Sequence, residues 1–66
     1  MNIVLNGEKR GLDDALTLRG LIDRLELNGK RLAIEVNEEV VPRSQHSEYR
    51  LHDGDRVEIV HAIGGG

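Results

Sequence analysis

One stretch of helical periodicity stands between two groups of segments that have the two-residue period of β-strands. After Thr17, the expected N-cap, four apolar side chains fall on one face of a helix: Leu18, Leu21, Ile22 and Leu25. Asn28-Gly29 is expected to end this helix. Because isolated hairpins are marginally stable, the helix has to cover one face of a single sheet. The predicted fold class is α+β, a roll in which one helix packs across a mixed sheet of four to five strands.

Alternating apolar residues and turn signals predict five strands. Asn6-Gly7 closes the first hairpin, since both residues tolerate the positive φ of a type I′ turn, and Asn37-Glu38 turns the second. Gly11 favours an edge position for the second strand. The first and last strands are the richest in apolar residues and are expected to lie side by side and parallel at the centre of the sheet. The predicted strands are residues 1–5, 8–12, 32–36, 39–41 and 56–61.

The segment after Pro42 carries no sustained period. One helical turn is expected from Ser44, after which Tyr49 and Leu51 return to the core. The residues Asp53-Gly54-Asp55 are typical of a turn. This segment is therefore predicted as a loop.

Composition excludes several classes of protein. The absence of Cys excludes a disulfide scaffold, a Cys-ligated zinc site and a thiol nucleophile. No apolar run approaches the ~20 residues of a membrane-spanning helix, and the N-terminus lacks the basic and apolar regions of a signal peptide, so a cytoplasmic protein with no membrane partner is expected. A net charge of -3 argues against nucleic acid as a partner. The C-terminal half is acidic, which is typical of a solvated face and also compatible with a basic partner.

The chain offers no recognisable catalytic or metal motif, neither a phosphate-binding glycine loop nor a nucleophile elbow nor a zinc-binding His-Glu-x-x-His. His46, His52 and His61 are expected to be separately exposed rather than to form a metal site with Glu48. We therefore expect no catalytic residue, no metal and no bound cofactor on this chain.

Structural roles are expected for the charged residues near the loop. Asp53 and Asp55 have short carboxylates that cap tight turns, and Arg43 is expected to tie the loop to a nearby carbonyl or carboxylate.

The sequence ends in Ala62-Ile63-Gly64-Gly65-Gly66, which has no period and no charge. Such a terminus can simply be frayed. A glycine end is also thin enough to enter a narrow channel in another protein and brings an unhindered terminal carboxylate there. We expect a folded domain over residues 1–61 and a flexible tail over residues 62–66.

The whole length of the chain resembles a known family, the ThiS sulfur carriers of thiazole biosynthesis, which have the β-grasp (ubiquitin-like) fold. The segments that carry the resemblance are Asn6-Gly7, residues 33–37 (AIEVN), 40–43 (VVPR), 53–55 (DGD), 57–60 (VEIV) and 62–66 (AIGGG). The family's minimal ending is two glycines, whereas this chain has three. The reactive carboxylate is still expected to be that of Gly66.

The resemblance implies a protein co-substrate in thiamine biosynthesis and not an enzyme. A ThiF-like adenylyltransferase would use its own ATP and Mg²⁺ to adenylate the Gly66 carboxylate. A sulfur donor such as a cysteine desulfurase system would convert the adenylate to a thiocarboxylate, and a ThiG-like thiazole synthase would accept the sulfur. Ala62, Ile63, Gly64 and Gly65 would be the tail inside the partner's active site, with Ile63 as an anchor.

Three alternatives remain at this point. The small subunit of molybdopterin synthase shares the Gly-Gly end, although it is usually longer and richer in aromatic residues. A ubiquitin-like modifier would join Gly66 to lysines of other proteins. A β-grasp interaction domain would bind a partner without covalent chemistry.

Overall fold

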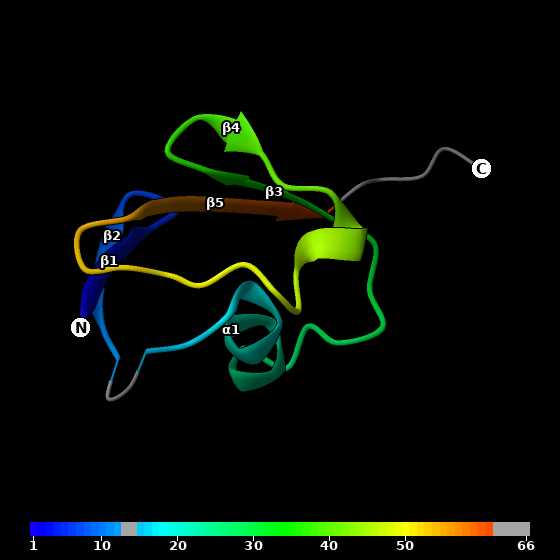
Figure 1. Cartoon of the computed structure of the whole chain (residues 1–66), viewed down its shortest axis with the longest axis horizontal. Helices are drawn as coiled ribbons and strands as arrows, with labels where there is room; N and C mark the ends of the chain where they lie inside the picture. Colours follow the sequence, from blue (N-terminus) through cyan, green and yellow to red (C-terminus); the bar gives the residue numbers. More distant parts are fainter. Residues whose placement is uncertain (13–14, 62–66) are drawn as a thin grey trace.

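The computed structural model describes residues 1–12 and 15–61 (Figure 1). The predicted tail, residues 62–66, and the boundary at its start lie outside the described residues. The elements in chain order are β1 (Asn2–Leu5), β2 (Glu8–Gly11), α1 (Leu18–Arg24), β3 (Leu32–Val36), β4 (Glu39–Val40), the 3₁₀ turn η1 (Arg43–Gln45) and β5 (Arg56–His61). Within the described ranges, no helix has the length and apolar character needed to span a membrane.

The strands form one mixed sheet of five strands in the order β2-β1-β5-β3-β4. β1 and β5 are parallel, and the other neighbouring strands are antiparallel. Helix α1 lies across one face of this sheet, and the other face has no helix over it (Figure 1). The predicted α+β fold, the edge position of β2 and the parallel pairing of the first and last strands are confirmed.

The core lies between α1 and the covered face of the sheet. Alternate residues of β1, β3 and β5 point into it, as the two-residue period predicted. Leu51 is 2% exposed and Tyr49 is half-buried against the core, so the expected return of this loop to the core is also confirmed. The buried residues are Ile3, Leu5, Leu18, Leu21, Ile22, Ile34, Val36, Val41, Leu51, Val57 and Ile59.

Both predicted hairpin turns have the left-handed backbone of type I′. Asn6 and Gly7 have φ of 49° and 83°, and Asn37 and Glu38 have φ of 52° and 71°. The Asn6 side chain also continues the β1–β5 pairing, since its Oδ1 accepts from the N–H of Ile59 at 2.8 Å and its Nδ2 donates to the Ile59 carbonyl at 3.1 Å. The first turn therefore fixes both a hairpin and the junction with the central strand.

The prediction that Asn28-Gly29 ends the helix is wrong, because α1 stops at Arg24 with Leu25 as C-cap. Glu26 takes the left-handed conformation with φ of 58°, and its N–H donates to the Asp23 carbonyl. The Leu27 N–H donates to the Ile22 carbonyl at 3.0 Å, which completes a Schellman motif. Because Leu27 packs against the core, burial of its side chain favours this early end.

Candidate functional site

The five predicted site residues, Ala62 to Gly66, lie outside the described residues, but the structure places the residue from which they continue. His61 is the last residue of β5, and β5 is the middle strand of the sheet. Strand β1 pairs with the start of β5, at Arg56 and Val57, whereas β3 pairs with β5 as far as its end. His61 pairs with Leu32, the first residue of β3. We call the place where His61 and Leu32 pair the tail root.

Two valines are exposed on the uncovered face of the sheet. Val60, next to the tail root, is 58% exposed, and Val40 on the edge strand β4 is 71% exposed. Two carboxylates also share this face, because Glu35 of β3 lies directly opposite Glu58 of β5. Like charges that face each other across strands destabilise a sheet slightly. Lys9 and Arg56, which both pair with Val4, lie on this face as well, so it combines exposed apolar side chains with charges of both signs.

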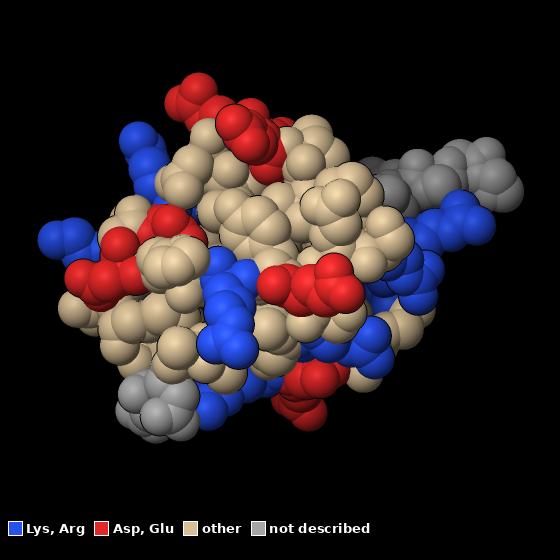
Figure 2. Space-filling view, in the orientation of Figure 1, with Lys and Arg blue, Asp and Glu red and all other residues tan. Residues whose placement is uncertain are grey.

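Acidic residues are more widely spread than their concentration in the C-terminal half of the sequence indicated. On the face drawn in Figure 2, the Asp and Glu side chains form separate groups and not one patch. This distribution is typical of a solvated surface, the simpler of the two interpretations made from the sequence.

A small pocket adjoins the tail root. Its volume is about 70 Å³, and Leu32 lines it together with Ile22 and Leu27. Two further lining residues, Arg19 and Arg43, are cationic, and the cation Lys30 is the other charged residue there. These residues come from α1, the loop before β3 and η1, which only the tertiary fold brings together.

The prediction that all three histidines are exposed is wrong for His46, which is 6% exposed. Its Nε2 lies 3.0 Å from the Val41 carbonyl oxygen, and its own carbonyl accepts from the Arg19 N–H at 3.0 Å. His46 is buried because η1 folds back between the end of β4 and the start of α1. His52 and His61 are exposed as expected, and no group of side chains within the described ranges could hold a metal ion.

Asp55 caps its turn as predicted, whereas the Asp53 carboxylate instead ties the turn to β1. Asp53 accepts from the Asn2 N–H at 2.6 Å, and Asp55 accepts from the His52 N–H at 2.8 Å. The prediction for Arg43 is wrong, since within the described ranges its guanidinium makes no hydrogen bond or ion pair. The reason is its place at the exposed start of η1, where the side chain extends into solvent.

Comparison with known proteins identifies the family. The profile of the ThiS family matches residues 3–66, which is nearly the whole chain. The chain belongs to the ThiS family. The sulfur carrier protein ThiS of Bacillus subtilis is 35% identical over 63 residues, covering 94% of this chain and 96% of that protein. The crystal structure of the thiamine biosynthesis protein ThiS from Geobacter metallireducens superposes with a TM-score of 0.87 at 30% identity and covers all of both chains.

The ThiS family is thus the family that the sequence resemblance predicted, and its members are sulfur carriers of thiamine biosynthesis and not enzymes. A thiazole synthase from Paramagnetospirillum magneticum is also 39% identical over 66 residues, covering all of this chain but 20% of that protein. The chain therefore spans about a fifth of the length of that relative. A ThiS-like segment is one part of a protein named thiazole synthase.

Sequence reasoning missed the cationic residues around the tail root. Arg19 and Arg43 are unremarkable in their own segments, since exposed basic residues are common on helices and loops. The two basic residues Lys30 and Arg31 directly before a predicted strand were the one local signal, and it gains meaning only when β3 is known to start where β5 ends.

Proposed function

We propose that this chain carries sulfur for the thiazole moiety of thiamine on the terminal carboxylate of Gly66. The observation that carries the proposal is the match to the ThiS family, which continues to Gly66. The position of the tail after β5 supports it, because the pairing of His61 with Leu32 fixes where the tail starts. The boundary between a domain of residues 1–61 and a tail of residues 62–66 belongs to the same proposal.

The proposed chemistry starts with activation, because a carboxylate is a poor electrophile. A ThiF-like adenylyltransferase, with its own ATP and Mg²⁺, joins AMP to the Gly66 carboxylate and releases pyrophosphate. The outer sulfur of a persulfide, supplied by a donor such as a cysteine desulfurase system, then displaces AMP and forms an acyl disulfide with the donor. A second thiol attacks the donor's sulfur, which breaks the S–S bond, leaves the thiocarboxylate on Gly66 and forms a disulfide between that thiol and the donor. Every catalytic group, the nucleotide and the metal belong to the partners, and the reaction takes place in the cytoplasm.

Thiazole synthase is the proposed sulfur acceptor. The similarity of this chain to one part of a protein named thiazole synthase supports this choice, since a carrier and its acceptor benefit from being held together. Ala62 and Ile63 form the neck of the tail in this proposal, with Ile63 anchored in the partner, and Gly64 and Gly65 thread the channel to its active site.

Intact-mass measurement tests the proposal. The chain is incubated with ATP, Mg²⁺, a ThiF-like enzyme and a persulfide donor, beside a variant that lacks Gly65-Gly66. We expect a mass increase equal to the replacement of one oxygen by sulfur in the full chain and none in the variant. If an enzyme of demonstrated activity leaves both masses unchanged, the tail is a passive terminus and a non-covalent interaction domain becomes the better interpretation.

Genetic complementation separates the proposed pathway from the nearest alternative. We expect the chain to restore growth of a thiazole auxotroph that lacks its sulfur carrier. Rescue of a molybdenum-cofactor auxotroph alone would instead assign the chain to molybdopterin synthase. Covalent high-mass adducts in a lysate would indicate a ubiquitin-like modifier.

A further inference from the structure

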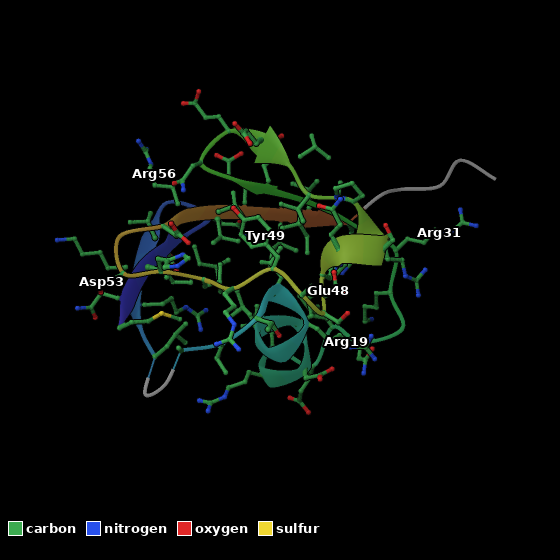
Figure 3. The ribbon with its side chains drawn as sticks, viewed as in Figure 1. Arg19, Arg31, Glu48, Tyr49, Asp53 and Arg56 are labelled. Carbon is green, nitrogen blue, oxygen red and sulfur yellow. The ribbon has the colours of Figure 1, made fainter. Side chains whose placement is uncertain are left out.

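Four basic side chains gather at the end of the molecule that holds the tail root. Lys30 and Arg31 directly precede Leu32, the residue that pairs with His61. Arg19 and Arg43 line the small pocket together with Lys30. Figure 2 shows blue side chains along this end of the molecule, and Figure 3 labels Arg19 and Arg31 among them. The basic collar is the set Arg19, Lys30, Arg31 and Arg43.

The charges of the basic collar are largely available to a partner. Lys30, Arg31 and Arg43 are exposed, and within residues 1–12 and 15–61 none of them lies within 4.0 Å of a carboxylate. Arg19 is the exception, since its Nε lies 3.5 Å from Asp23. Glu48 lies on the same side of the molecule but forms no ion pair with a described residue (Figure 3). The collar is therefore a local concentration of positive charge on a chain with a net charge of -3.

The pocket inside the collar is too small for a metabolite. Its volume of about 70 Å³ is well below the roughly 300–1,000 Å³ of pockets that enclose small molecules. Three cations, Arg19, Lys30 and Arg43, line it beside apolar residues, and cationic side chains bind carboxylates strongly. This geometry favours a protein surface as the ligand.

The length of the tail places the collar at the proposed interface. A fully extended chain spans at most ~3.6 Å per residue, so five residues reach about 18 Å beyond His61. An enzyme that reacts with Gly66 must therefore bring its surface close to the tail root, where Arg31 and Lys30 lie. Exposed charges attract over about 10 Å at moderate salt, so the collar contributes when the two surfaces approach more closely than the full reach of the tail, about 18 Å.

We propose that the basic collar docks against an acidic surface around the tail entrance of the activating enzyme and steers the tail into it. This inference rests on the proposed function, because it takes the enzyme that adenylates Gly66 as the partner. Complementary charge mainly raises the association rate and makes that rate depend on salt. Acidic side chains elsewhere on the chain repel the same surface and disfavour other orientations.

The experiment compares two variants that lose the same amount of charge. The collar variant carries Lys30→Gln, Arg31→Gln and Arg43→Gln. The control variant carries Lys9→Gln, Arg10→Gln and Arg56→Gln. The control positions lie on β2 and at the start of β5, the end opposite His61. Circular dichroism and urea unfolding first establish that both variants fold.

Two measurements separate the effect of the collar on association from the chemistry at the end of the tail. Stopped-flow association with the ThiF-like enzyme, in the absence of ATP, is measured at low and high salt, and thiocarboxylate formation is followed by intact mass. We expect the collar variant to associate about tenfold more slowly at low salt and to lose most of the salt dependence, with little change in the control variant.

Equal association rates for the collar variant and the unchanged chain would overturn the inference, and so would an equal decrease in both variants. Loss of loading in the unchanged chain, with association intact, would instead contradict the proposed function. A collar-specific decrease in association supports the inference whatever the mass measurement shows.

Discussion

The hydrogen bonds of the Asn6 side chain allow the stability loss of an Asn6 variant to be predicted from the structure. The side chain makes two hydrogen bonds to the backbone of Ile59, which replace the next pair of the β1–β5 ladder. Substitution Asn6→Gly removes both bonds but keeps the left-handed backbone, since glycine adopts a φ of 49° without strain. The substitution therefore isolates the contribution of the side chain to the central junction of the sheet.

The expected loss follows from the two bonds. Each is partly buried, and a hydrogen bond of this kind contributes about 0.5–1.5 kcal/mol net, so Asn6→Gly should lower the free energy of unfolding by about 2 kcal/mol. A domain of this size shifts its Tm by about 4–8 °C per kcal/mol, which gives a decrease of about 8–16 °C. At roughly 0.05–0.15 kcal/mol per residue, the whole chain is stable by about 3–10 kcal/mol, so this loss is a large fraction.

Urea unfolding followed by circular dichroism measures the effect, because the chain has no Trp. Glu38→Gly is the matched control, since Glu38 also has a positive φ, of 71°, in a type I′ turn, and its side chain makes no hydrogen bond within the described residues. Subtracting its effect removes the change that glycine makes to the unfolded chain. The stability loss of Asn37→Gly should lie between the losses of the two other variants, because the hydrogen bonds of the Asn37 side chain to Asp55 and Arg56 are exposed.

A difference below about 0.5 kcal/mol between Asn6→Gly and Glu38→Gly would refute this reasoning, since it is less than one net hydrogen bond. Water would then replace the Asn6 amide at Ile59 without loss, and the β1–β5 junction would depend on apolar packing alone.

Three further predictions concern the helix end, the core and the tail. Glu26→Gly should raise the free energy of unfolding by about 1 kcal/mol, because Glu26 has a left-handed φ of 58° that glycine adopts freely; an unchanged urea midpoint would show that the glutamate side chain compensates. Ile34→Val should lower it by about 0.5–1.5 kcal/mol, since Ile34 is 1% exposed, and a smaller loss would indicate a core that readjusts. Ile63→Asp should slow thiocarboxylate formation with little change in Tm; a large decrease in Tm would place Ile63 in the core.

The sequence correctly predicted those parts of the fold that neighbouring residues in the chain determine. Asn6-Gly7 specifies its own turn, and the two-residue period of residues 32–36 determines which side chains face the helix. The prediction of where α1 ends was wrong because Gly29 resembles the glycine that commonly follows a helix. The burial of Leu27 instead favours a left-handed conformation at Glu26, three residues before Gly29. A contact of the tertiary fold thus overrode the local signal.

The candidate site likewise has one part that the sequence shows and another that only the folded structure shows. The glycine ending is visible in the sequence because the chemistry proposed for it depends on composition alone. The basic collar is not, since Arg19, Arg43 and the pair Lys30-Arg31 become neighbours only in the folded chain. Burial of His46 was missed for the same reason, because its partner Val41 belongs to the strand hairpin and its contact with α1 is tertiary.

The central position of β5 also has a consequence for biosynthesis of the carrier. The hairpin of β1 and β2 and the hairpin of β3 and β4 share no strand pairing until β5 lies between them. Because β5 follows the other four described strands in the chain, the five-stranded sheet forms only after residues 56–61 have been translated. A chain terminated before residue 56 lacks the strand that joins the two hairpins and also lacks the tail. Copies that lack residues 56–61 therefore cannot assemble the five-stranded sheet.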